Sequence, residues 1–494
     1  MLEKIDLSQK LEKPKYKEII NNLELRIAEL QREAKDLKIP IIIVFEGWGA
    51  AGKGTLINKL IISLDPRGYS VYSVKPPNEE EIYRPFLWRY WIKIPEKGRM
   101  AIFDRSWYRR VLEERIDRSI KNKDWQNAYQ EIKSFERQLF DDDYTIIKFF
   151  LHISKAEQKK RFKKLEKSSS TAWRVTKEDW KHNRQYQKYV EAIEEMLAKT
   201  DTDYAPWTIV EAHDRRFATV KVFQKTIHAI QEKIDFYSKA TKSEKSPKKY
   251  FDYLESRSSS ILEKVDLMKN YSRTRYVKEL KICQSRIREL EHEVYLKRLP
   301  VIIVYAGWDA AGKGGNIKRL VSGMDPRGYE VIPISAPNDA EKAHHYLWRF
   351  WIKIPKAGHI AIYDRSWYGR VLVERIEGLC TEEEWKRAYR EINEFEEQMI
   401  NFSTVLVKFW LHIDKDEQLK RFKERGLNEH KRWKITEEDW RNREKWDQYQ
   451  EAVDEMLYRT STVYAPWTII ESNCKWYARI KAQKTVIQEI EKRL

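Results

Sequence analysis

Two stretches of this chain have the residue types and the spacing of a phosphate-binding loop. From Gly307 to Gly314 the sequence is GWDAAGKG, in which two glycines separated by four residues precede a lysine. Glycines allow backbone N–H groups to turn towards phosphate oxygens, and the following helix N-terminus and lysine attract negative charge. A similar stretch, GWGAAGKG, begins at Gly47. Because the pattern occurs twice, phosphate binding is favoured over a plain glycine turn. We expect the second loop to be lined by Gly307, Gly312, Lys313, Gly314 and Gly315.

Acidic residues near the second loop are candidates for holding a metal ion. The residue after the loop lysine is usually Ser or Thr, whose hydroxyl binds Mg²⁺, but here it is Gly314. Asp309 lies inside the loop, where a carboxylate could bind Mg²⁺ or orient a reacting phosphate. Asp364 follows an apolar run and suits a second acidic ligand, although a helix cap before Ser366 is the alternative. The sequence therefore predicts Mg²⁺ as cofactor, held by Asp309 and Asp364.

Three arginines follow Asp364 at intervals of five residues. They are Arg365, Arg370 and Arg375, and on one helix this interval would not place them in a single stripe. An arginine near the start of the segment could point at phosphates, for which its forked, permanently charged guanidinium is suited. Arg365 is the favoured candidate. Arg370 and Arg375 are predicted to bind substrate, with salt bridges to nearby glutamates as the alternative for Arg375.

A second basic segment lies between residues 417 and 440. In a phosphate-loop kinase this region forms a mobile helical lid that closes over the donor, whereas a solvated helix face is the alternative. We predict that lid residues along the phosphates include Arg421, Lys423 and Arg432. Asn338, which follows Pro337 after an expected strand, either binds nucleotide or caps a helix.

Elements that position these residues can be expected from the apolar pattern. Continuous apolar runs at 300–306, 360–363 and 404–413 alternate with helical patterns, including one expected helix from about 340 to 352. Such runs predict parallel strands buried on both faces, hence an α/β fold with ligands at the carboxyl ends of the strands.

The whole design occurs twice. Gly47 and Gly307 are separated by 307 − 47 = 260 residues, and Asp104 and Asp364 by the same number. A period of this length indicates a duplicated domain rather than a solenoid. Residues 238–249 are polar and basic, which is typical of a linker. We predict a first domain at 1–237, a linker at 238–260 and a second domain at 261–494.

Composition limits the class of protein. The 494 residues include 95 Lys and Arg against 77 Asp and Glu, a net charge of +18, which favours an anionic partner. No apolar run approaches the roughly 20 residues of a membrane helix, and the three cysteines form no metal-binding pattern. We expect a soluble cytoplasmic protein without a membrane partner.

The loop, the DRSWYGRVLVER sequence that starts at Asp364, the Pro337–Asn338 pair and the basic lid together resemble the polyphosphate kinase 2 family. The tandem copies are similar to its fused two-domain members, the polyphosphate:AMP phosphotransferases. The resemblance implies a phosphate-loop kinase-like three-layer sandwich with a helical lid. It also implies transfer of the terminal phosphoryl group of inorganic polyphosphate to AMP, giving ADP. It assigns Asp309 and Asp364 to the metal and acceptor phosphate, and Lys313 and Arg365 to charge stabilisation.

The first copy departs from this pattern. Gly49 replaces Asp309, and Glu113 stands where the second copy has Val373. We therefore predict that the second copy is catalytic and the first largely inactive. The expected partners are inorganic polyphosphate and AMP or ADP, and no nucleic-acid partner is expected. By analogy with duplicated homodimers, we expect an intramolecular pseudo-dimer that could also form a homo-oligomer. The alternatives are an ATP-dependent nucleotide kinase and a polyanion- or nucleic-acid-binding protein with relic loops.

Overall fold

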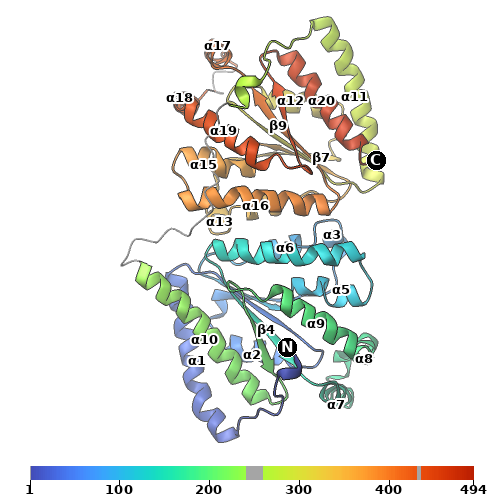
Figure 1. The fold of residues 1–494 in the computed structure, drawn as a ribbon, viewed down its shortest axis with the longest axis vertical. Coiled ribbons are helices and arrows are strands. Elements are labelled where there is room, and N and C mark those ends of the chain that lie inside the picture. Colours follow the sequence, from blue (N-terminus) through green and yellow to red (C-terminus); the bar gives the residue numbers. More distant parts are fainter. Residues whose placement is uncertain (1, 241–259, 431–434) are drawn as a thin grey trace. The chain divides into compact units, whose positions relative to one another are not determined.

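A computed structural model describes residues 2–240, 260–430 and 435–494. Each copy of the repeat contains one five-stranded sheet, and every strand pair is parallel (Figure 1). The first sheet has the order β2-β3-β1-β4-β5, and the second has the order β10-β9-β6-β8-β7. The predicted α/β class and the tandem duplication are therefore confirmed.

The strands of the first sheet are β1 (Ile41–Gly47), β2 (Tyr69–Ser73), β3 (Met100–Asp104), β4 (Thr145–His152) and β5 (Trp207–Glu211). Those of the second are β6 (Val301–Gly307), β7 (Tyr329–Pro333), β8 (Ile360–Asp364), β9 (Val405–His412) and β10 (Trp467–Glu471). Every residue of the central strand β6 is buried except Gly307. A strand covered on both faces needs such an unbroken apolar run, which is why its position was predictable.

Helices cover both faces of each sheet (Figure 1). In the first copy the α-helices are α1 (Lys13–Asp36), α2 (Lys53–Ile62), α3 (Glu79–Ile82), α4 (Trp88–Trp91), α5 (Glu113–Ile116), α6 (Asn122–Asp141), α7 (Lys155–Glu166), α8 (Lys177–Arg184), α9 (Tyr186–Thr200) and α10 (Arg215–Ala240). In the second copy they are α11 (Arg273–Leu296), α12 (Lys313–Val321), α13 (Asp339–Lys342), α14 (Trp348–Trp351), α15 (Val373–Ile376), α16 (Glu382–Asn401), α17 (Lys415–Gly426), α18 (Glu437–Glu444), α19 (Trp446–Thr460) and α20 (Lys475–Glu491). In the second copy α11, α12 and α20 lie on one face of the sheet, and α16 and α19 lie on the other.

One expected helix is wrong. The segment from about 340 to 352 forms two short helices, α13 and α14, instead of one. Arg349, Phe350 and Trp351 are consecutive and all buried. Helix α13 ends at Lys342, and a turn in which the Leu347 N–H donates to His345 Nδ1 at 3.2 Å separates it from α14.

The described residues group into two compact units. The first contains 2–77, 86–240 and 338–348, and the second contains 78–85, 260–337 and 349–494. Helix α10 continues to Ala240, three residues into the predicted linker, and the 3₁₀ helix Leu262–Lys264 opens the second copy. The rest of the predicted linker, 241–259, lies outside the described residues. Among the helices described, none is long and apolar enough to cross a membrane.

Candidate active site

The second glycine loop joins β6 to α12 in a conformation that requires glycine. Gly307 has φ +149°, and a Cβ there would lie 2.6 Å from the Leu411 carbonyl oxygen on β9. Gly312, at φ +108°, is the N-cap of α12. Around Gly314, in the first turn, a Cβ would meet no atom within 4 Å, so this side of the helix N-terminus is open. Open backbone N–H groups at a helix N-terminus form an anion-binding site.

Lys313 lies over this loop. Its Nζ donates hydrogen bonds to the carbonyl oxygens of Gly307, at 2.8 Å, and Trp308, at 3.2 Å. Removal from water lowers the pKa of the Lys313 ammonium, while the charges of Asp309 and Asp364 raise it and that of Arg365 lowers it. These charges act on one ammonium because the loop and the carboxyl end of β8 meet at one edge of the sheet.

Asp309 is held by residues from three other elements. Its Oδ2 accepts a hydrogen bond from Asn442 Nδ2 of α18 at 2.9 Å. Its Oδ1 lies 3.6 Å from Arg365 Nη2, and its carbonyl oxygen accepts from Gln418 Nε2 of α17 at 3.1 Å. The loop carboxylate is therefore fixed in direction before any ligand arrives.

Arg365 owes its direction to a left-handed backbone. Its φ is +66°, and its N–H donates to the Tyr305 carbonyl oxygen at 3.0 Å, which turns the chain at the end of β8. The guanidinium remains half exposed, at 51%. A half-exposed cation next to Asp309 and Lys313 can contact a phosphate without first leaving a buried ion pair.

A pocket opens between these residues. Its polar lining includes Asp309, Lys313, Arg365 and Asn442, and its walls include Tyr368, Leu372, Val373, Trp410 and Tyr449. Trp308, which also lines it, stacks on Trp446 with the ring centroids 3.8 Å apart and the planes at 8°. The pocket thus combines charged groups with rigid aromatic walls, as ligand sites commonly do.

Two predicted phosphate ligands, Arg370 and Arg375, form ion pairs away from this pocket. Arg370 Nε lies 3.2 Å from Glu374 Oε2. Arg375 Nη1 donates to Glu455 Oε2 at 2.6 Å, and its guanidinium lies 3.9 Å from the Trp385 ring centroid. The segment after Asp364 is not one helix, because the 3₁₀ helix Trp367–Val371 precedes α15. The three arginines therefore point in different directions.

Arg421 is buried under the loop instead of lying along its mouth. Only 2% of the residue is exposed, and its guanidinium donates to the carbonyl oxygens of Ala310, Ala311, Ser472 and Asn473 at 2.6–3.1 Å. Lys423, on the same helix, is exposed. Arg432 lies outside the described residues. Asn338 caps α13, accepting from the Glu341 N–H at 2.8 Å, which corresponds to the capping alternative.

The predictions from the sequence did not include Asn442 as a site residue. They also did not distinguish Arg425 from the other basic residues of the lid. The pKa of Arg425 is lowered mainly by burial, and its charge acts on Lys313. A signal existed in the comparison of the two copies. His182 stands in the place of Asn442 and Leu165 in the place of Arg425, and both changes accompany the replacement of Asp309.

A buried polar network supports the segment that carries Arg365. The Lys408 ammonium of β9 donates to Glu396 Oε2 at 2.7 Å, Tyr368 Oη at 3.0 Å and the Thr460 carbonyl oxygen at 2.8 Å. Trp367 Nε1 donates to Glu396 Oε1 at 3.0 Å. Lys408 and Glu396 have no exposed side-chain surface. This network fixes the chain directly after Ser366.

Comparison with known proteins agrees with this arrangement. The family model of polyphosphate kinase 2 matches residues 10–236 and again 270–494. The chain belongs to the polyphosphate kinase 2 family. It is 41% identical to a polyphosphate:AMP phosphotransferase of Pseudomonas aeruginosa over 99% of both chains. It is 39% identical to one from Pseudomonas syringae pv. tomato, covering 100% of this chain and 98% of that one.

A solved member of the polyphosphate kinase 2 family has the same fold. The crystal structure of a polyphosphate kinase 2 from Pseudomonas aeruginosa superposes with a TM-score of 0.88 at 39% identity, covering 100% of this chain and 99% of that chain. The resemblance predicted from the loop and the DRSWYGRVLVER sequence is therefore confirmed.

The first copy carries the same loop in different surroundings. Lys53 Nζ donates to the Gly47 and Trp48 carbonyl oxygens at 2.8 and 3.2 Å, as its counterpart does. Its neighbouring arginines, however, are occupied by a carboxylate. Arg105 Nε lies 3.2 Å from Glu113 Oε1, and Arg109 forms an ion pair with the same residue. Arg365 lies farther from its nearest carboxylate, at 3.6 Å, and its side chain is more exposed than that of Arg105, so it is the more available of the two to a phosphate.

Proposed function

We propose that this protein transfers the terminal phosphoryl group of inorganic polyphosphate to AMP, giving ADP, at the site around the second loop. The observation that carries the proposal is the convergence of Asp309, Lys313 and Arg365 on one pocket. The full-length similarity to two relatives named polyphosphate:AMP phosphotransferase supports this donor and acceptor.

The reaction exchanges one phosphorus–oxygen bond for another. An oxygen of the AMP phosphate forms a bond to the terminal phosphorus of the chain. The bond from that phosphorus to the bridging oxygen breaks, and the bridging oxygen keeps the electron pair as the new end of a shorter chain. Negative charge spreads over the transferred oxygens, so positioning and fixed cations supply most of the catalysis. Lys313 and Arg365 are cations that line the pocket beside the loop.

Two carboxylates suit a divalent cation at this site. Among the described residues no cluster of three His, Cys, Asp or Glu side chains could hold a metal by itself. Mg²⁺, however, is usually held by one or two carboxylates together with waters and substrate phosphates. Asp309 and Asp364, whose charges both act on Lys313, fit that requirement. Mg²⁺ bound there would neutralise charge on the phosphate oxygens.

The other predicted site residues receive revised proposals. Arg421 is proposed to position the loop, because its guanidinium is engaged with four backbone carbonyl groups. Arg370 and Arg375 are proposed to stabilise the segment after Asp364 through their ion pairs. Lys423 and Asn338 remain proposed contacts for polyphosphate and nucleotide. Cytoplasmic location, absence of a nucleic-acid partner and assembly as a pseudo-dimer or homo-oligomer are proposed from the sequence.

We assign catalysis to the second copy. Gly49 provides no carboxylate, and a Cβ at this position would lie only 3.1 Å from Asp179 Oδ1. Glu113 holds Arg105, the counterpart of Arg365. The first copy therefore lacks a counterpart of the carboxylate in the second loop, and its counterpart of Arg365 pairs with Glu113.

The test measures ADP by chromatography after the full chain is mixed with Mg²⁺, AMP and either polyphosphate or ATP. ADP from polyphosphate, with little from ATP, is expected; turnover with ATP alone would indicate an ordinary nucleotide kinase. Asp309→Asn is compared with Lys53→Ala in the same assay. We expect a loss of about 100-fold or more for the first and little change for the second. Equal losses would contradict the assignment to the second copy.

A further inference from the structure

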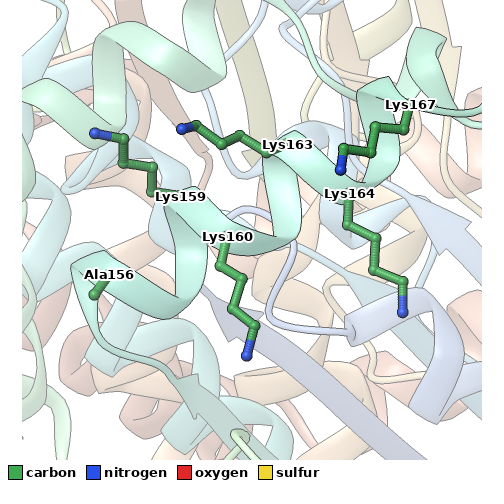
Figure 2. Close-up of a pocket in the computed structure, with 6 residues that line it drawn as sticks. All are labelled: Ala156, Lys159, Lys160, Lys163, Lys164 and Lys167. Carbon is green, nitrogen blue, oxygen red and sulfur yellow. The ribbon is translucent and has the colours of Figure 1, made fainter.

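Helix α7 of the first copy carries a cluster of exposed lysines around a surface hollow (Figure 2). Figure 2 shows Lys160 and Lys164 extending to one side of the helix, and Lys159 and Lys163 extending to another. We call the cluster the lysine ladder. It consists of Lys159, Lys160, Lys163, Lys164 and Lys167, all of them exposed.

The lysine ladder is a property of the first copy. At the equivalent positions of α17 the second copy has Leu419, Glu424 and Leu427 in place of Lys159, Lys164 and Lys167. Only two of the five lysines have a lysine as their counterpart. The first copy therefore has more lysines on this helix than the second, next to a loop in which Gly49 stands in the place of Asp309.

Such a cluster is unfavourable without a counterion. Lysines four residues apart lie about 6 Å apart along a helix, where like charges repel. Among the described residues, the ion pairs of the ladder are limited to Lys160 with Glu157 at 3.6 Å, and Glu157 also pairs with Arg161 at 2.8 Å. The helix dipole favours basic residues in the last turn, but it does not account for Lys159 or Lys160, which lie nearer the start.

The ladder begins at the first glycine loop. Gln158 Nε2 donates to the Gly49 carbonyl oxygen at 3.2 Å, and Arg161 donates to the carbonyl oxygens of Ala50 and Ala51 at 3.1 and 3.0 Å. The helix is therefore fixed to the loop by Gln158, just before the first of these lysines, and by Arg161 among them. Its exposed lysines lie on two sides of the helix, in the part that follows Gln158.

We propose that the lysine ladder binds inorganic polyphosphate along α7, so that the first copy holds donor without performing the chemistry. The inference rests on the proposed function, which supplies the polyanion. A flexible chain with a charge on every repeating unit can contact several lysines that are spaced along one helix. Single-stranded nucleic acid would need aromatic platforms as well, but the aromatic residue within α7, Phe162, is buried. Trp173, in the 3₁₀ helix Ala172–Arg174 that follows α7, is 72% exposed and provides a test of that alternative.

The experiment measures binding of a short linear polyphosphate to the full chain at several salt concentrations. The ladder variant changes four lysines to glutamine: K159Q, K163Q, K164Q and K167Q. The control variant removes the same charge from exposed lysines in and before α1 of the same copy: K10Q, K13Q, K15Q and K17Q. Glutamine keeps the helix propensity of lysine, and circular dichroism verifies the fold.

We expect the wild-type chain to show two classes of polyphosphate site and the ladder variant to lose one. A single-stranded polyanion releases about 0.7 counterion for each contact with a cation. For four lysines, the logarithm of the binding constant of that class should therefore fall with the logarithm of the salt concentration with a slope of about 3. The kcat and the KM for AMP should stay unchanged. Retention of both classes in the ladder variant, or an equal loss in the control variant, would overturn the proposal.

Two further arms separate the alternatives. If single-stranded RNA displaces polyphosphate from this class and Trp173→Ala weakens the binding, the surface is a nucleic-acid site and the proposal fails. If neither RNA nor Trp173→Ala changes the binding of polyphosphate, the result supports the proposal. If polyphosphate binds to the lysine ladder but no ADP forms, the proposed function fails. If ADP forms normally but no binding to the lysine ladder is found, only this inference fails.

Discussion

Glu46 offers a quantitative test of how the first copy differs from the second. It precedes the first glycine loop, it is 4% exposed, and its counterpart is Ala306. Its Oε1 accepts a hydrogen bond from Ser106 Oγ at 2.8 Å. Burial raises the pKa of Glu46 from about 4.5 to about 7, against the opposing effects of the Ser106 hydrogen bond and the Lys53 charge.

The raised pKa makes the stability of the first copy depend on pH. The folded carboxyl group keeps its proton up to a pH of about 7, whereas the unfolded one loses it near 4.5. Because the folded state binds the extra proton in this window, the contribution of Glu46 to stability is highest below pH 4.5 and falls as the pH rises to 7. At about 1.36 kcal/mol per pH unit, the loss approaches about 3 kcal/mol.

Glu46→Gln should remove this dependence. The amide oxygen can still accept from Ser106 Oγ, but the side chain cannot ionise. We expect similar stability of the variant and the wild type at pH 5, and a variant that is more stable by up to about 3 kcal/mol at pH 8. Glu18→Gln, which removes an exposed carboxylate from the same copy, is the control for the loss of one charge.

The assay is denaturant unfolding of the full chain between pH 5 and 8, followed by tryptophan fluorescence. The transition that Glu46→Gln moves is assigned to the first copy. A difference between variant and wild type that does not change with pH would refute the argument, because it would mean that the buried carboxyl group does not titrate in this window. A larger difference at pH 5 than at pH 8 would refute its sign.

The remaining predictions concern the buried network of each copy and the site of the second. Lys408→Met should leave a buried carboxylate without its cation and lower the free energy of unfolding by about 3–5 kcal/mol. Lys148→Met, in the matching network of the first copy, should cost a similar amount, and denaturant midpoints check both. Arg421→Lys keeps the charge but cannot reach four carbonyl groups, so kcat should fall by up to about 100-fold with little change in the KM for polyphosphate. Asn442→Ala should free Asp309 and lower kcat/KM about 10-fold, with weaker activation in an Mg²⁺ titration.

The sheet and the loop could be predicted because their signals are local. Strand β9 has eight consecutive buried residues, and such a run is visible in the sequence as it stands. The glycines are equally visible, since Gly307 and Gly312 have backbone angles that other residues avoid. A property that depends only on the residues of one segment can be predicted from that segment, without knowing what packs against it.

The roles of the arginines could not be predicted in this way. Arg375 pairs with Glu455, eighty residues along the chain, and Arg421 with carbonyl groups near Ala310 and Asn473. A guanidinium that binds phosphate and one that binds a distant carbonyl group have the same local sequence. Only packing decides between them, so charge clusters identified the region of the site but not the individual ligands.

The comparison of the two copies separates residues that hold the fold from residues that face the pocket. The first copy keeps the buried network, with Lys148 Nζ donating to Glu136 Oε2 at 2.8 Å, and keeps Arg161 under its loop. It changes the positions around the phosphate site, where Gly49 and Glu113 replace Asp309 and Val373. A copy that had lost selection on its fold would vary in both sets. The pattern fits a first copy retained as a folded unit with a different task, and the lysines of α7 are the feature through which it could perform one.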